Sequence, residues 1–260
     1  MNRRTLMGLT AAALMLTPLA ASADALADIK TRGTLRAAID LGSPPFGMTD
    51  GAMQPIGSEV ESAQLLADFL GVKLEIVEVT SPNRIPFLMT GKADVVVASL
   101  SVTDERKKVI DFADPHGVIG VIAAAPASIE IKDLDGLAGK PVATTRGSSN
   151  DTVATAMLTS STLVRYDDDA TLVTALVSGQ NDIMVSSPMV LKAVNDRRTN
   201  DPLEVKVTLK VNPYAVGLRK NEDALKAAIN DWVETDLANG KLREIYKKYN
   251  GVDLPADMPK

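Results

Sequence analysis

Residues 91–115 read GKADVVVASLSVTDERKKVIDFADP, and this stretch decides the fold class. Its first part, ADVVVA at 93–98, is short, apolar and rich in β-branched valine, which is typical of a strand buried in a sheet. The strand runs into serines, and Thr103 then stands where the N-cap of a short helix is expected. A buried strand followed at once by a capped helix predicts an α/β fold with a parallel sheet.

The same alternation of strands and helices continues on both sides of this stretch. Ser58, with Glu61 three residues later, matches a capping box at the start of a helix. Ser81 and Pro82 read as an N-cap followed by a first-turn proline. The patterns predict strands at 34–40, 72–79, 140–145, 163–166 and 182–185, and helices at 58–70, 82–90, 148–158, 170–178 and 188–195.

Two extended segments, near 118–125 and 207–217, separate and follow the second set of alternations. Helices are expected after them, at 222–239 and 241–249. The fold class is therefore α/β, with two βα lobes joined by two extended crossover segments. We expect one lobe to comprise residues 24–120 and 215–260, and the other to comprise residues 121–214.

The N-terminus has the layout of a secretory signal: Arg3 and Arg4, an apolar run over 6–20, then Ala21-Ser22-Ala23. We expect residues 1–23 to be a signal peptide, cleaved after Ala23, and the mature protein to be periplasmic. The two arginines leave the twin-arginine export route open, although the rest of that pattern is weak. A lipid anchor would need a cysteine, and the sequence has none.

The composition excludes several function classes. The 260 residues carry a net charge of −5 and only 3% aromatics, so nucleic acid is a poor partner. Without cysteine there can be no disulfide, thiolate nucleophile or zinc–sulfur site. His116 is the single histidine, which rules out a histidine-rich metal site. We therefore expect neither a metal nor a cofactor, and we interpret His116 as a surface or hinge residue.

Polar residues follow the predicted strands at the ends where ligands bind in open α/β sheets. Arg106 offers a planar fork that matches a carboxylate, and Ser99 and Ser101 offer oxygens to an ammonium group. Any one of these residues alone is better explained as a cap or a solvated side chain. Five such loops together predict a cleft site for a small carboxylate, and they lie at 40–46, 81–83, 99–106, 146–150 and 186–187.

Several segments together resemble the polar amino-acid-binding periplasmic proteins of bacterial ABC importers. They are DLGSPPFG (40–47), GSEVESAQLLADFLGVKLEIVEV (57–79), the stretch quoted at the opening, GKPVATTRGSSNDT (139–152) and GKLREIYKKYNG (240–251). The resemblance implies the type II periplasmic-binding-protein fold, closure of the lobes on an amino acid, and delivery to membrane permease and ATPase subunits. We expect the protein to act as a monomer.

The resemblance also implies roles for individual residues. Arg106 matches the carboxylate-binding arginine, and Ser99 and Ser101 match the positions that hold the ammonium and carboxylate. Asp40 matches an acidic position that touches the ligand side chain in some members, and Phe46 matches an aromatic lining position. The predicted ligand-binding residues are Asp40, Phe46, Ser99, Leu100, Ser101, Arg106, Ser148, Ser149 and Ser187, with no catalytic residue.

The sequence departs from the family pattern in the second lobe. Many members place an aspartate after its last strand to pair with the ligand ammonium, but this chain has Ser186 and Ser187 there. Either another acid substitutes or the ligand is not a plain α-amino acid. Ser43 replaces a common aromatic, which favours a small or polar ligand side chain. Arg146 could meet an acidic side chain or point into solvent.

A cleft enzyme on the same fold, similar to cyclohexadienyl dehydratase, is the alternative function. Such an enzyme needs a general acid in the cleft. The nearby acids are Asp40, Glu59, Glu61 and Asp151, and their spacing suggests no partner for any of them. A ligand-binding sensor module is a third possibility, but the chain shows no signalling segment. We therefore expect a binding protein rather than an enzyme.

Overall fold

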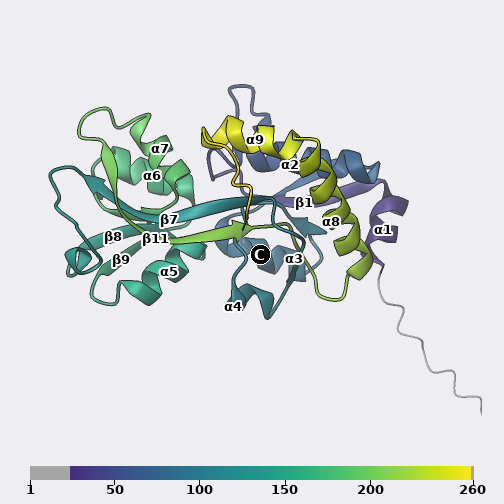
Figure 1. Ribbon diagram of the computed structural model, residues 1–260, viewed down its shortest axis with the longest axis horizontal. Helices are drawn as coiled ribbons and strands as arrows, with labels where there is room; N and C mark the ends of the chain where they lie inside the picture. The colour runs from purple at the N-terminus through teal and green to yellow at the C-terminus, as the bar shows by residue number, and fades with distance from the viewer. Residues whose placement is uncertain (1–23, 259–260) are drawn as a thin grey trace, which may run out of the picture.

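The structure is a computed structural model that describes residues 24–258. The predicted signal peptide, residues 1–23, lies outside the described residues. The protein has two lobes side by side, and two long strands run from one to the other (Figure 1). These strands are β7 (Gly117–Pro126) and β11 (Leu203–Tyr214), which pair antiparallel along their length.

The first lobe contains the N-terminal part of the chain and its last two helices. Its sheet has the order β4-β1-β5-β12-β6, with β1 parallel to β4 and β5. A small hairpin, β2 with β3, follows the first strand. The strands are β1 (Thr34–Ile39), β2 (Met48–Thr49), β3 (Pro55–Ile56), β4 (Lys73–Glu78), β5 (Val95–Val96), β6 (Asp111–Phe112) and β12 (Gly217–Leu218). The helices are α1 (Ala25–Arg32), α2 (Ser58–Leu70), η1 (Ser81–Asn83), α3 (Arg84–Met89), α4 (Asp104–Lys107), α8 (Asp223–Ala238) and α9 (Lys241–Asn250).

The second lobe is built around a sheet of order β11-β7-β10-β8-β9. Strand β8 is parallel to β9 and β10, whereas β7 is antiparallel to β10. The remaining strands are β8 (Pro141–Thr145), β9 (Thr162–Tyr166) and β10 (Met184–Ser186). The helices are η2 (Asp135–Leu137), α5 (Ser149–Met157), α6 (Asp169–Val177) and α7 (Pro188–Asn195). The expected α/β class with two lobes is confirmed.

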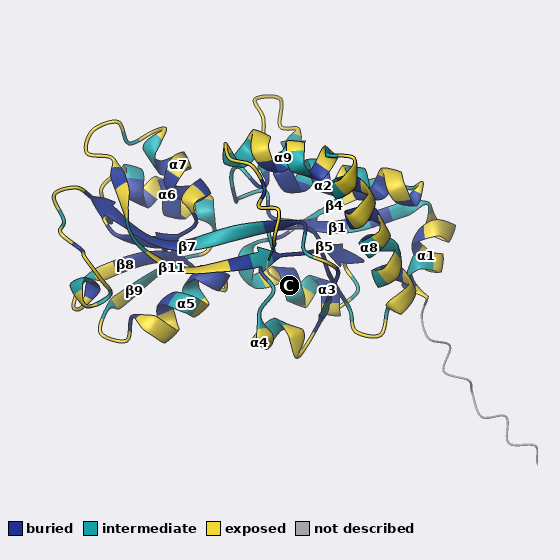
Figure 2. Ribbon diagram, viewed as in Figure 1, coloured by how far each residue is buried: buried dark blue, intermediate teal, exposed yellow. Residues whose placement is uncertain are grey.

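Each lobe has its own apolar core beneath its helices. Figure 2 shows buried strands under helices whose outer faces are exposed. In the first lobe, Ile39 and Val95 pack with Leu66 and the fully buried Trp232. The Trp232 indole donates a hydrogen bond of 2.9 Å to Asp236, which satisfies the one polar atom of that ring. Because α8 and α9 complete this core, the chain must cross back from the second lobe.

The hinge requires a glycine and buries the single histidine. A Cβ on Gly117 would lie 2.1 Å from the Tyr214 ring, so only glycine fits between β7 and β11 there. His116 is 3% exposed and meets the edge of Tyr214 at 4.9 Å between ring centroids. Its backbone N–H donates to the Tyr214 carbonyl at 3.2 Å. His116 is thus hinge structure, and the surface interpretation is wrong.

Two details of the predicted helix starts differ. Ser58 is the first helical residue of α2 rather than its cap, and Gly57 occupies the cap position without a side-chain hydrogen bond. The capping box is therefore absent, and Glu61 instead accepts hydrogen bonds from Lys248 and Tyr249 of α9. Likewise, Ser81 begins a short 3₁₀ turn, η1, ahead of α3. Helix α1 was not predicted at all, because its apolar face is confined to a few residues such as Ala25 and Ile29.

Candidate functional site

A small cavity lies where loops from both lobes meet, and it leaves about 20 Å³ for the centres of water-sized molecules. That is room for about one water. An amino acid can therefore reach it only if the lobes separate first. The lining is mostly polar and comes from both lobes: Ser43, Phe46, Ser81, Arg84, Ser99, Ile119, Ser148, Ser149, Asn150, Asp169 and Ser187.

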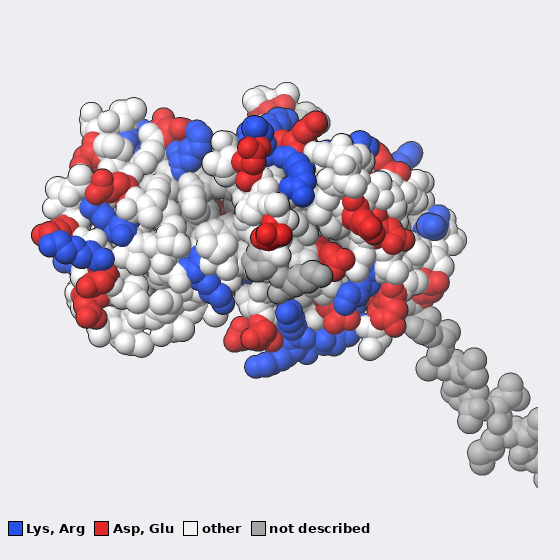
Figure 3. Space-filling view, viewed as in Figure 1, with Lys and Arg blue, Asp and Glu red and all other residues white. Residues whose placement is uncertain are grey.

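The two lobes touch around this cavity through hydrogen bonds. Ala170 N–H donates to the Gly42 carbonyl at 2.8 Å, and the Ser43 hydroxyl bonds to Asp169. The hydroxyls of Ser101 and Ser149 lie 2.9 Å apart. Figure 3 shows the lobes in contact, with acidic and basic side chains interspersed over the viewed face. These contacts describe a closed arrangement of the two lobes.

Ser99 is held in an unusual backbone conformation by a buried acid. Its φ is 44°, in the left-handed region that few non-glycine residues adopt. The Ser99 N–H donates to Glu59 Oε2 at 2.9 Å, and Glu59 is 1% exposed at the start of α2. The same carboxylate lies 3.9 Å from His116 Nε2, so one buried acid connects the serine loop to the hinge.

Two of the serines that line the cavity from the second lobe are N-cap residues of helices. Ser148 caps α5 by accepting from Asp151 N–H, and Ser187 caps α7 by accepting from Val190 N–H. Asn150 is 8% exposed and lines the cavity, and its side chain makes no hydrogen bond to another described residue. Helix N-termini carry partial positive charge, so this side of the cavity favours an anionic or hydrogen-bond-accepting group.

Arg106 lies at the junction of the lobes rather than in the cavity lining. It donates to the Ser101 carbonyl at 2.9 Å and, across the lobes, to the Gly147 carbonyl at 3.4 Å. No described carboxylate forms an ion pair with it. Burial, together with the nearby charge of Arg84, lowers the pKa of Arg106 to about 9. A half-buried cation without an anionic partner is unfavourable, so the arrangement favours an incoming carboxylate.

Arg84 lines the cavity but is not among the ligand-binding residues predicted from the sequence. It is 5% exposed, and its Nε and Nη1 atoms donate to the carbonyls of Ser81 and Ala98. Burial lowers its pKa, while Asp40, Asp169 and Glu59 oppose that change. Among the described residues it forms no ion pair. An arginine on the packed side of a predicted helix was the available signal, since that position normally takes an apolar residue.

Asp169 is the second charged residue of the lining that was missed. It is the first residue of α6, and its two carboxylate oxygens accept from Ser43 of the first lobe and Thr145 of the second. Burial raises its pKa. Burial also raises the pKa of Asp40 to about 6, although Arg84 opposes the shift. In the run Asp167-Asp168-Asp169 nothing in the sequence distinguishes the last acid from exposed Asp167 or from Asp168, which caps α6.

The structure places the predicted residues in three groups. Phe46, Ser99, Ser148, Ser149 and Ser187 line the cavity. Asp40, Ser101 and Arg106 lie beside it, and Asp40 Oδ2 accepts from the Ser81 hydroxyl at 3.5 Å. The Leu100 side chain is 1% exposed and packs in the core of the first lobe, so it does not face the cavity.

Other acids and bases considered from sequence point elsewhere. Arg146 is exposed and pairs with Asp167, so it points into solvent. Asp151 pairs with Arg165. Within residues 24–258 no group of three or more His, Cys, Asp or Glu side chains could hold a metal ion. No helix in the same range is both long and apolar enough to cross a membrane.

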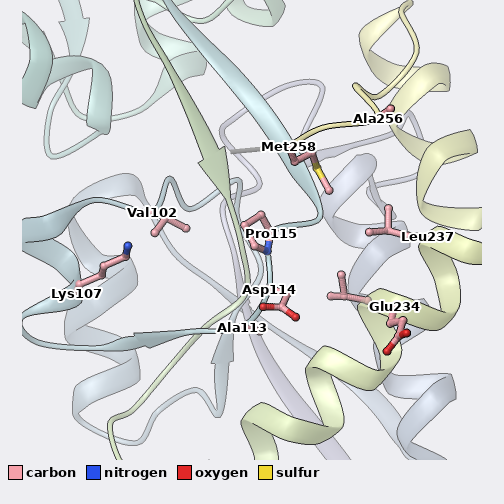
Figure 4. A pocket seen from close by; sticks show the side chains of 10 residues that line it. Val102, Lys107, Ala113, Asp114, Pro115, Glu234, Leu237, Ala256 and Met258 are labelled. Carbon is pink, nitrogen blue, oxygen red and sulfur yellow. The ribbon is translucent and has the colours of Figure 1, made fainter. Parts of the chain in front are cut away.

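A larger groove of about 460 Å³ lies away from this cavity on the first lobe. Figure 4 shows Met258 and Ala256 of the C-terminal tail on one side, with Leu237 and Glu234 of α8 nearby. Pro115, just before the hinge, lies at its centre. None of the predicted site residues lines this groove.

The family model of the bacterial extracellular solute-binding proteins, family 3, matches residues 35–252. The chain belongs to this family. The predicted resemblance is thereby confirmed.

Two bacterial proteins are similar to this solute-binding protein over most of its length. The ABC transporter glutamine-binding protein GlnH of Bacillus subtilis is 30% identical over 231 residues, which are 87% of this chain and 84% of the relative. The L-cystine-binding protein TcyJ of Escherichia coli K12 is 33% identical over 262 residues, 98% of this chain and 97% of the relative.

Solved structures of amino-acid-binding proteins share its fold. An ancestral amino acid-binding protein, described as a precursor of cyclohexadienyl dehydratase, superposes with a TM-score of 0.79 at 30% identity. It covers 86% of this solute-binding protein and 98% of its own chain. A mutant of ArgBP from T. maritima has a TM-score of 0.80 at 28% identity, covering 88% and 100% of the two chains.

Proposed function

We propose that this protein captures a small polar amino acid, or a related carboxylate, between its lobes and delivers it to an ABC importer. The observation that carries the proposal is Arg106, a half-buried guanidinium at the lobe junction with no carboxylate partner among the described residues. A ligand carboxylate would supply that partner through charge-assisted hydrogen bonds. The names of the relatives, which bind glutamine and L-cystine, support an amino acid as the solute.

Closure of the lobes would accompany binding. The cavity is too small for free access, and the bonds from Ser43 to Asp169 and from Ser101 to Ser149 exist only when the lobes meet. A ligand that contacts both sides favours the closed state by its differential affinity. We expect residues 24–120 with 215–260 to move as one body, and residues 121–214 as the other.

The setting of this function is the periplasm, with export by the signal at residues 1–23 and cleavage after Ala23. The partners are a membrane permease and its ATPase subunits, and the protein acts on them as a monomer. Mass spectrometry of the secreted protein tests the cleavage site, because processing after Ala23 leaves Asp24 as the first residue.

We also propose that the protein catalyses no reaction. Burial raises the pKa of Asp40 to about 6, close to the value that a general acid would need. However, Asp40 is not among the residues that line the cavity, and its Oδ1 already accepts from Gly42 N–H. Incubation with a prephenate-type acid should give no product, and turnover would favour the dehydratase alternative.

A thermal-shift screen tests the proposed function. The mature protein is unfolded and refolded to strip any bound solute, and then screened against amino acids and keto acids. A ligand at about 100 times its dissociation constant should add about 2.7 kcal/mol of stability. A clear shift with one group of amino acids supports the proposal, and no shift with any amino acid contradicts it.

A further inference from the structure

Arg84 and Asp169 face the cavity from opposite lobes, and they carry opposite charges. Arg84 comes from α3 of the first lobe, and Asp169 comes from the start of α6 in the second. Each influences the pKa of the other, yet the two form no ion pair within 4 Å. A ligand in the cavity would therefore contact a positively charged side chain from one lobe and a negatively charged side chain from the other.

Both side chains are fixed by their surroundings and keep unused hydrogen-bonding capacity. Arg84 donates from Nε and Nη1 to the carbonyls of Ser81 and Ala98, and its Nη2 has no hydrogen-bond partner among the described residues. The two oxygens of Asp169 each accept one hydroxyl, from Ser43 and Thr145, and a carboxylate oxygen can accept two bonds. Asn150, buried and without a hydrogen-bonded partner among the described residues, adds another polar group to the same wall.

We infer that Arg84 and Asp169 form a clamp between the lobes, which selects ligands whose far end accepts a hydrogen bond at one atom and donates one at another. This inference rests on the proposed function and specifies its ligand class. A primary amide fits, with its oxygen on Arg84 and its nitrogen on Asp169. The second amino-acid head of a two-headed ligand fits in the same way, with its carboxylate on Arg84 and its ammonium on Asp169.

Ligands with a single charge at the far end are disfavoured by the same geometry. A side-chain carboxylate would bind Arg84 but meet Asp169, and a side-chain ammonium would bind Asp169 but meet Arg84. An aliphatic end would leave both charges without an oppositely charged or hydrogen-bonding group on the ligand. Asp169 therefore disfavours acidic side chains, Arg84 disfavours basic ones, and both residues disfavour apolar ones.

Calorimetry on the stripped and refolded protein tests the clamp with five probes: L-glutamine, L-cystine, L-glutamate, L-lysine and L-norleucine. We expect L-glutamine or L-cystine to bind at least about tenfold more tightly than the other three, as for the loss of one hydrogen bond to a charged group. Tight binding of L-glutamine would indicate that the clamp holds a side-chain amide. Tight binding of L-cystine would indicate that it holds the second amino-acid head of a two-headed ligand. If L-glutamate, L-lysine or L-norleucine binds most tightly, the clamp is contradicted while the proposed function stands. If no amino acid binds, the proposed function itself fails.

Single substitutions test whether Asp169 weakens the binding of L-glutamate and whether Arg84 weakens the binding of L-lysine. Asp169→Asn keeps a side chain that can bond to Ser43 and Thr145, and it should narrow the preference for L-glutamine over L-glutamate by about tenfold. Arg84→Gln should narrow the preference for L-glutamine over L-lysine instead. The control is Asp167→Asn, since Asp167 is exposed and pairs with Arg146.

Folding of each variant is checked by circular dichroism, and the ratio between two probes on one variant cancels losses common to both. Preferences that stay unchanged in both Asp169→Asn and Arg84→Gln would overturn the clamp. A shift in the Asp167→Asn control equal to that in Asp169→Asn would overturn it as well.

Discussion

The two lobes hold their site residues in different ways. In the first lobe, the recognition groups are fixed by contacts within that lobe: Glu59 holds the Ser99 N–H, and Arg84 bonds to the Ala98 carbonyl. In the second lobe, Ser148 and Ser187 are held by the helices they cap, whereas Asp169 and Ser149 bond across to the first lobe. The first lobe is therefore a recognition surface that exists without closure, and the second lobe completes it.

Arg106→Ala tests this difference with the largest expected effect. Arg106 is on the first lobe and bonds mainly within it, through the Ser101 carbonyl. Losing a bidentate, charge-assisted contact to a carboxylate should weaken binding by more than about 100-fold, since each such bond contributes about 1.5–3 kcal/mol. Calorimetry with the tightest amino acid measures the loss. The control is Arg146→Ala on the exposed surface of the second lobe, and equal affinities for Arg106→Ala and the wild type would remove Arg106 from the site.

Asp40→Asn tests how much the ionised form of the buried Asp40 destabilises the folded first lobe. Burial raises the pKa of Asp40 to about 6, so the folded state prefers the protonated form. Stability from this group is present below the ordinary pKa of an aspartate and is lost as the pH rises through about 6. The empty wild type should lose up to about 3 kcal/mol relative to Asp40→Asn between pH 4 and pH 7, at about 1.4 kcal/mol per pKa unit.

Urea unfolding of the empty proteins at the two pH values measures the effect of Asp40. Asp231→Asn is the matched control, because Asp231 is exposed on α8. If the wild type and Asp40→Asn show the same dependence of unfolding free energy on pH, the pKa of Asp40 is not raised in the folded protein.

Glu59→Ala tests whether the first lobe is pre-organised. It leaves the buried Ser99 N–H without its acceptor, which should cost about 1–3 kcal/mol of stability. Glu59→Gln retains an acceptor at that position and should cost less. Urea unfolding measures both, together with amino-acid affinity. Equal losses of stability and affinity in the two variants would show that the hydrogen bond from Ser99 N–H to Glu59 does not pre-organise the first lobe.

Ser43→Ala tests the contacts that span the lobes and should have the smallest effect. It removes the hydroxyl that bonds to Asp169 and should shift the open–closed balance by about 1 kcal/mol, the net value of one hydrogen bond. Fluorescence energy transfer between dyes on the two lobes measures the closed fraction at half-saturating ligand. Ser160→Ala, on the exposed surface of the second lobe, should leave that fraction unchanged.

The sequence predicts the framework well because each part rests on local patterns. The buried run at 93–98, the apolar hinge strands and the periodic helices are visible in single stretches of chain. Five of the nine predicted ligand-binding residues line the cavity for the same reason, since they follow strands or begin helices. The Leu100 side chain was included with its serine neighbours, but alternation along the chain turns it into the core.

Arg84 and Asp169 could not be predicted because their roles depend on tertiary packing. Asp169 looks like its acidic neighbours at the start of a helix. Arg84 is marked only by its place on the packed side of α3, so neither residue indicates a cavity until the two lobes are brought together. The aspartate that many family members place after β10 is absent from this chain, yet the cavity gains another acid, Asp169 of α6. Only the placement of α6 against Ser43 reveals that.

A crystal structure of the stripped and refolded protein with its tightest amino acid tests the central claim most directly. We predict a closed molecule in which the ligand carboxylate bonds to Arg106 and the far end lies between Arg84 and Asp169. The hydrogen bonds between the lobes should flank the ligand on both sides. A ligand bound outside this cavity, or bound with its carboxylate away from Arg106, would contradict the account.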